Sequence, residues 1–350
     1  MILNRRKFIF ISLINLITFN TSKSHSEVKA DLTLNNKIRL GKGNISHLAE
    51  LKSFNYHLKE NIYDSFPLWD FTSGMSNFQY HAFDEINGHL YTLQHSSTNG
   101  KGGKISRFPM ANNGKVKAID SQDYCHSVGH QMLSVENLKN GTVKLWSAKG
   151  IYSSLSVIRF DYCPNESPKN IEEFIVFNPE EFGKFYPTGN LSYDQKWLIV
   201  RGKSKMNSSY KGYNCIAVFQ VEKLINNKER EAWHLAEYVW PYEFYDNDPK
   251  SNNNPQSIVC DGNHIFLIFG PREIDKQNII KKYTLTGDIV APEANLNIGI
   301  KEAKELSDGT SNEIEGAQFL KVNKNTPPAL TLGYVRGGPV FYKGIELVPY

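Results

Sequence analysis

The chain has 350 residues, of which 40% are hydrophobic and 22% charged, a balance typical of globular proteins and not of disordered ones. The formal net charge of +4 is already present in residues 1–30, which contain five basic residues (Arg5 to Lys7, Lys23 and Lys29) and one acidic residue, Glu27. The rest of the chain is therefore about neutral. Phosphate binding needs clustered Lys and Arg, and we therefore expect no nucleic-acid partner.

The N-terminus has the pattern of an export signal. A basic segment, Arg5 to Lys7, precedes an apolar run from Phe8 to Phe19, which is too short for an uncleaved membrane anchor. The segment 4–9 is similar to a twin-arginine signal, and the general secretory route is the alternative. We expect cleavage after Ala30, or near Ser24 to Ser26. The sequence thus predicts a signal peptide over residues 1–30, an N-terminal segment over 31–65, and a periplasmic or secreted protein.

The chain beyond residue 66 contains five copies of one short strand pattern. Each copy opens on a polar residue or glycine, alternates between apolar and other side chains, and ends on an acid or amide. Such alternation is typical of a strand with two different faces. The copies span residues 79–84, 131–136, 189–194, 256–261 and 318–323. Their spacing of about 50–70 residues indicates repeated structural units.

Each copy continues into further strands. Turn residues such as Asn87-Gly88 and Asn140-Gly141 predict tight hairpins. Second strands are expected over 90–94, 143–147, 197–201, 264–269 and 330–334, third strands over 105–108, 157–160, 216–219, 280–283 and 340–342, and fourth strands over segments such as 174–177 and 236–240. The sequence therefore predicts an all-β, five-bladed β-propeller over residues 66–350, with about four antiparallel strands in each blade. A β-sandwich with long loops is the structural alternative.

The fifth copy reaches Tyr350 without a fourth strand. We expect an N-terminal strand within Phe66 to Phe71 to supply it. Such closure would remove the open sheet edges that otherwise invite aggregation.

Several positions of these repeats carry a family resemblance. They are Gln79, Ala82 to Asp84, Asn87-Gly88, Leu90-Tyr91 and Gln94 in the first copy, Gly129-His130-Gln131 with Leu145-Trp146 in the second, and Glu315-Gly316-x-Gln318 near the end. With these motifs, residues 70–345 resemble the propeller shared by teichoic acid biosynthesis protein C-like proteins and the receptor-binding proteins of some staphylococcal phages, to which helveticin-type bacteriocins are similar. The resemblance implies contact with cell-wall or envelope glycopolymers, and it implies no catalytic mechanism.

The first residue of each inner strand is expected at one rim of the propeller channel. A ring of amides would then form there, interrupted by Gly189. The ligand-binding residues that we expect at this rim are Gln79, His81, His130, Gln131, Gln256, Glu315 and Gln318. Amides donate and accept hydrogen bonds together, which suits sugar hydroxyls. The alternative is that these amides tie the blades together or hold channel water.

Motifs for catalysis, cofactors and metals are scarce. The sequence lacks a Gly-x-Ser-x-Gly elbow, a His-Glu-x-x-His motif and a phosphate-binding glycine-rich loop before a helix. We therefore assign no catalytic residue, no metal site and no cofactor. The four cysteines, Cys125, Cys163, Cys215 and Cys260, lack the spacing of a zinc site and allow three disulfide pairings, among which the sequence does not decide.

These observations favour an exported, monomeric binding module for an extracellular or cell-envelope glycan. An enzyme acting on such a polymer, a lyase or a hydrolase, is one alternative, and a secreted bacteriocin-like protein is another. No stretch beyond the N-terminal run is apolar for long enough to cross a bilayer, so we expect no transmembrane segment in the mature protein.

Overall fold

A computed structural model describes parts of the chain between residues 66 and 346, all within the unit Gly43–Tyr350. The described ranges are 66–67, 77–95, 103–110, 118–124, 128–129, 131–150, 154–184, 187–242, 255–270, 278–296, 314–321, 328–334, 339–340 and 345–346. The predicted signal peptide, the segment 31–65, Cys125 and His130 lie outside them. Within these ranges no helix has the length and apolar character that a bilayer crossing requires.

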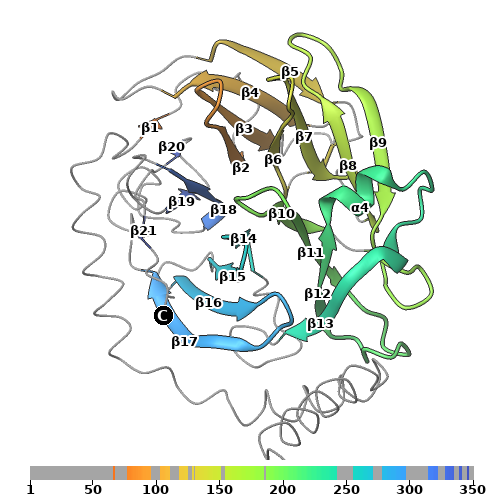
Figure 1. Ribbon diagram of the computed structural model, residues 1–350. Coiled ribbons are helices and arrows are strands. Elements are labelled where there is room, and N and C mark those ends of the chain that lie inside the picture. The colour runs from red at the N-terminus through yellow and green to blue at the C-terminus, as the bar shows by residue number, and fades with distance from the viewer. Residues whose placement is uncertain are drawn as a thin grey trace, which may run out of the picture. The chain divides into compact units, whose positions relative to one another are not determined.

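The described strands form four four-stranded antiparallel sheets, which we call blades 1 to 4 (Figure 1). Blade 1 consists of β2 (Asn77–Asp84), β3 (His89–His95), β4 (Gly103–Pro109) and β5 (Asp120–Tyr124), and blade 2 of β6 (Ser134–Asn137), β7 (Val143–Ala148), β8 (Ser156–Asp161) and β9 (Lys169–Ile175). Blade 3 consists of β10 (Thr188–Leu191), β11 (Trp197–Lys203), β12 (Asn214–Gln220) and β13 (Ala236–Tyr242), and blade 4 of β14 (Ser257–Cys260), β15 (His264–Phe269), β16 (Asn278–Thr284) and β17 (Ile289–Leu296). The prediction of four-stranded antiparallel blades is confirmed.

Blade 5 is built differently from the other blades. It pairs β18 (Ile314–Leu320), β19 (Ala329–Tyr334) and β21 (Ile345–Glu346), while β1 (Phe66–Pro67) pairs with β20 (Pro339–Val340). The prediction of a third strand over 340–342 was wrong, because Leu330 of β19 pairs with Ile345 and Val340 pairs with Phe66. Pro67 and Pro339 cannot donate ladder hydrogen bonds, which suits a short edge pair.

Short helical segments and tight turns connect the strands. The helix α4 (Val221–Asn226) and the 3-10 turn η1 (Trp233–Leu235) lie between β12 and β13. At the predicted hairpins Gly88 and Gly141 have φ of +68° and +81°, a backbone conformation that favours glycine.

The inner strands of the five sheets follow one another in a closed series. β2 lies beside β6, β6 beside β10, β10 beside β14 and β14 beside β18, and β18 returns to β2. Because each sheet presents its inner strand to two neighbours, residues near the ends of these strands come from different blades and can form one site.

Four hydrophobic clusters fill the interfaces between successive blades. Tyr80 and Leu145 belong to the cluster of blades 1 and 2, Trp146 and Phe219 to that of blades 2 and 3, and the other two clusters join blade 3 to blade 4 and blade 4 to blade 5. The side chains of Cys215 and Cys260 are buried in these clusters. Burial of this apolar surface is the main stabilising contribution to the fold.

The interface between blade 5 and blade 1 contains a row of polar side chains. His81 Nε2 and Thr331 Oγ1 lie 2.9 Å apart across it. Thr92 and Ser106 occupy the register positions beside His81 on β3 and β4, and both are buried. We call His81, Thr92, Ser106 and Thr331 the closing seam, because they join the first blade to the last.

Candidate functional site

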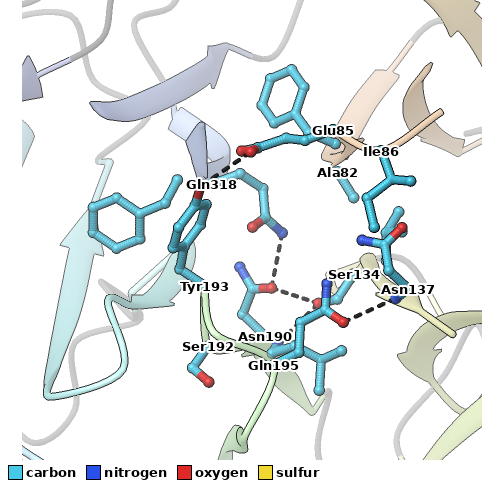
Figure 2. Close-up of a pocket in the computed structure, with 14 residues that line it drawn as sticks. Ala82, Glu85, Ile86, Ser134, Asn137, Asn190, Ser192, Tyr193, Gln195 and Gln318 are labelled. Carbon is cyan, nitrogen blue, oxygen red and sulfur yellow. Dashed lines mark hydrogen bonds between the residues drawn. The ribbon is translucent and has the colours of Figure 1, made fainter. Parts of the chain in front are cut away.

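A pocket of about 200 Å³ opens where the inner strands of four blades end in their turns (Figure 2). We call it the inner-strand pocket. The residues that line it are Ala82, Phe83, Glu85 and Ile86 of blade 1, Ser134, Val135 and Asn137 of blade 2, Asn190, Leu191, Ser192, Tyr193 and Gln195 of blade 3, and Gln318 and Phe319 of blade 5. Amide, hydroxyl and carboxylate groups from separate blades thus converge on one small hollow.

Asn190 organises one side of this pocket. Its Oδ1 accepts hydrogen bonds from Ser134 Oγ and from Gln318 Nε2, the latter at 2.8 Å, and its Nδ2 donates to the carbonyl of Ala317 at 3.3 Å. Gln318 Nε2 also donates to the carbonyl of Leu133 at 3.0 Å. Three blades therefore hold these side chains in fixed orientations, which a preformed site requires.

Glu85 is held at the pocket by groups of blade 3 and blade 5. Its Oε2 accepts a hydrogen bond from the Tyr193 hydroxyl at 3.1 Å (Figure 2). Its Oε1 accepts one from the backbone N–H of Lys321 at 2.9 Å. Burial and the Glu85 carboxylate raise the pKa of Tyr193, so its hydroxyl stays protonated and donates. Gln195 Oε1 accepts from the backbone N–H of Asn137 at 2.9 Å, which joins blade 3 to blade 2.

Two of the predicted rim amides lie together at the opposite ends of the inner strands. Gln131 Nε2 donates to Gln256 Oε1 at 3.5 Å, and Thr188 Oγ1 donates to Gln131 Oε1 at 3.1 Å. This group links blades 2, 3 and 4. The contacts show these amides tying blades together.

Gln318 lies apart from Gln131 and Gln256. In blade 5, Ala317 and Phe319 pack against blade 4, as Ile258 and Cys260 of blade 4 pack against blade 3. Side chains alternate along a strand, so Glu315, and not Gln318, occupies the position that corresponds to Gln256. The pairing of β18 with β19 also shifts between Ile314 and Gly316, which obscures the register in the sequence.

The remaining predicted rim residues are mostly buried. His81 is fully buried in the closing seam, and burial lowers its pKa to about 3, so the ring is neutral there. Gln79 and Glu315 are also buried, whereas His130 lies outside the described residues. Gln79 lies near the start of β2, and Glu315 lies near the start of β18.

Sequence reasoning missed Asn190, Glu85, Tyr193 and Gln195. One signal was available, because Asn190 is an amide at a repeat position that is occupied by Tyr80 and Met132 in blades 1 and 2. In the part of the chain that the structure describes, no group of three or more His, Cys, Asp or Glu side chains could hold a metal ion.

The inner strands form a closed series, and a polar pocket lies at their ends. These two features define the protein as a β-propeller whose site is formed by several blades. The family model described as the phage five-bladed β-propeller receptor-binding platform domain matches residues 77–340. The chain belongs to this family. The five-bladed architecture and the resemblance to phage receptor-binding proteins are thereby confirmed.

The chain also matches solved structures at low sequence identity. The tail fiber of Staphylococcus aureus phage P68 is 18% identical with a TM-score of 0.53, over 81% of this chain and 52% of the fiber chain. The chain thus spans about half the length of that fiber. MPT-4, a mannose phosphorylase from Leishmania mexicana, is 10% identical with a TM-score of 0.43, over 85% of this chain and 93% of its own. No curated protein matches the chain.

Proposed function

We propose that this receptor-binding propeller is exported, that its ligand is a glycopolymer of a bacterial cell envelope, and that the inner-strand pocket holds one unit of that polymer. The observation that carries the proposal is the convergence of Glu85, Asn190, Gln195 and Gln318 from three blades on one pocket. Amides and hydroxyls of this kind match the hydroxyl groups of sugars. Membership of the receptor-binding family supports a surface ligand.

The size and chemistry of the pocket support binding of a small polar group. Its volume of about 200 Å³ is below the range that is usual for drug-sized ligands, so one sugar unit fits better than a longer segment. Among the residues that line it, Glu85 is the one carboxylate. Glycoside hydrolysis generally uses two carboxylates, and the lining therefore supports binding over hydrolysis.

Blocking the mouth of the pocket is expected to weaken binding without affecting the fold. Ile86 lines the pocket and is 68% exposed, so Ile86→Arg places a long side chain at the opening at little cost in stability. We expect the dissociation constant for the best ligand on an array of bacterial surface glycans to rise at least about tenfold, or roughly 1.4 kcal/mol. Isothermal titration calorimetry of purified mature protein measures it.

Ile171→Arg is the matched control for this experiment. Ile171 is also an exposed isoleucine, at 45%, but it lies on the outer strand β9 of blade 2. The two variants carry the same change in charge and should have the same melting temperature. Equal affinities of Ile86→Arg, Ile171→Arg and the unchanged protein would contradict the pocket as the binding site, and an array without any bound glycan would contradict the ligand class.

Export supports a surface role and has its own test. The basic segment and apolar run of residues 5–19 have the pattern of a signal peptide, and we expect the mature protein to begin within about ten residues of Asp31. N-terminal sequencing of protein recovered from the periplasm or the medium checks this. Protein that stays in the cytoplasm with Met1 at its start would refute export.

A further inference from the structure

The inner-strand pocket has a definite arrangement of hydrogen-bond acceptors. Gln318 uses both hydrogens of its amide nitrogen, one on the carbonyl of Leu133 at 3.0 Å and one on Asn190 Oδ1 at 2.8 Å. Its amide therefore cannot turn to offer a nitrogen to a ligand without breaking both bonds. What Gln318 presents to the pocket is its carbonyl oxygen, an acceptor.

Glu85 adds a second acceptor that is negatively charged. Each of its carboxylate oxygens accepts one hydrogen bond, from Tyr193 and from the N–H of Lys321, and each keeps a further lone pair. These two contacts hold the carboxylate between blade 3 and blade 5. The ligand thus meets a fixed carboxylate and a fixed carbonyl oxygen.

Positive charge is missing from the lining. None of the residues that line the pocket is Lys, Arg or His. Lys196, which follows Gln195 in the chain, has a side chain that is 75% exposed and pairs with Asp194 at 3.1 Å. The donors that the lining offers are neutral amides such as Gln195, whose Oε1 is already held by Asn137. A phosphate or carboxylate entering the pocket would lose its hydration and meet Glu85 without a compensating cation.

We infer that the inner-strand pocket recognises a neutral or cationic group that donates hydrogen bonds, with a free amino sugar preferred, and that it rejects phosphate and carboxylate groups. This inference rests on the proposed function and names the chemical class of ligand unit that the same site takes. An ammonium offers three donors and a positive charge, which match Gln318 Oε1 and the Glu85 carboxylate.

The test titrates mature protein with three sugars of one shape, namely glucosamine, glucose and glucose 6-phosphate, at neutral pH, and follows binding by NMR. We expect glucosamine to bind about tenfold more tightly than glucose, and glucose 6-phosphate at least tenfold more weakly than glucose. Glu85→Gln removes the charge and keeps the shape. It should reduce the preference for glucosamine over glucose to less than about threefold.

Glu222→Gln is the matched control, because Glu222 is an exposed carboxylate on α4 and lies outside the pocket. It should leave all three affinities unchanged, and Ile86→Arg should abolish them. Equal or tighter binding of glucose 6-phosphate, or an unchanged amine preference in Glu85→Gln, would overturn the inference while sugar binding in the pocket still stood. Failure of all three sugars to bind would overturn the proposed function together with the inference.

Discussion

Replacing Glu136 by alanine is expected to lower the free energy of unfolding by about 3–5 kcal/mol. The Glu136 carboxylate is buried within blade 2, where it accepts hydrogen bonds from Arg159 Nε at 2.6 Å, Arg159 Nη2 at 3.0 Å and Trp146 Nε1 at 2.7 Å. Burial disfavours the charge of Arg159, but the bonds to Glu136 outweigh it and raise the pKa of the guanidinium. Without Glu136, a buried cation and the Trp146 N–H both lose partners.

Glu172→Ala is the control for this prediction, because Glu172 contacts the same guanidinium from the surface. Its carboxylate accepts from Arg159 Nη1 at 2.7 Å, but its side chain is 39% exposed. Exposed ion pairs contribute about 0–1 kcal/mol, so this loss should be small. Urea denaturation followed by tryptophan fluorescence gives both values, and equal destabilisation by the two substitutions would contradict the dominant role of Glu136.

Gly189→Ala is expected to destabilise the protein by about 3 kcal/mol, and Gly189→Gln, which would complete the amide ring, by at least as much. A Cβ at Gly189 would lie 2.4 Å from the carbonyl oxygen of Ile199 and 3.2 Å from Cα of Val200. Both contacts are with the backbone of β11, which pairs with β10 at this position and cannot move aside as a flexible side chain would. The close approach of two strands therefore explains why glycine interrupts the amides.

Gly183→Ala provides the comparison for Gly189. A Cβ there would have the carbonyl oxygen of Lys203 as its nearest contact, at 3.9 Å, an ordinary van der Waals distance. The melting temperature of Gly183→Ala should stay within about 2 °C of that of the unchanged protein. A loss of 3 kcal/mol corresponds to a fall of roughly 5 °C in a domain of this size. Differential scanning calorimetry distinguishes the two, and a fully stable Gly189→Ala would refute the steric explanation.

The blades could be predicted because alternation and turns are local properties of the sequence. The strands around Leu90, Val143 and Trp197 and the glycine turns at Gly88 and Gly141 lie where the repeats placed them. Blade 5 was harder because its inner strand has an irregular register near Gly316 and its third strand comes from residues 345–346. Neither feature leaves a periodic signal in the sequence.

The inner-strand pocket could not be predicted because its residues belong to four blades, and five of them lie in the turns after the strands. Glu85 meets Tyr193 and the N–H of Lys321 only once blades 1, 3 and 5 are assembled. Amides recur at the first position of the sequence repeats, and this recurrence predicted Gln131 and Gln256 as ligand-binding residues. In the structure a hydrogen bond between these two side chains links blade 2 to blade 4. Among the predicted ligand residues, Gln318 alone lines the pocket.

The closing seam has a consequence for the order in which the chain folds. His81 and Thr331 are 250 positions apart, and joining them requires closure of nearly the whole propeller. Loop-closure entropy grows with this separation, and non-local pairing slows folding. Burial of apolar surface stabilises the four hydrophobic interfaces whenever two blades come close together, because the hydrophobic effect has no direction. A hydrogen bond between a histidine and a threonine stabilises the protein only at the correct distance and angle. We therefore expect the four hydrophobic interfaces to assemble first. The closing seam should form last, and it should form only when blade 1 and blade 5 are correctly aligned.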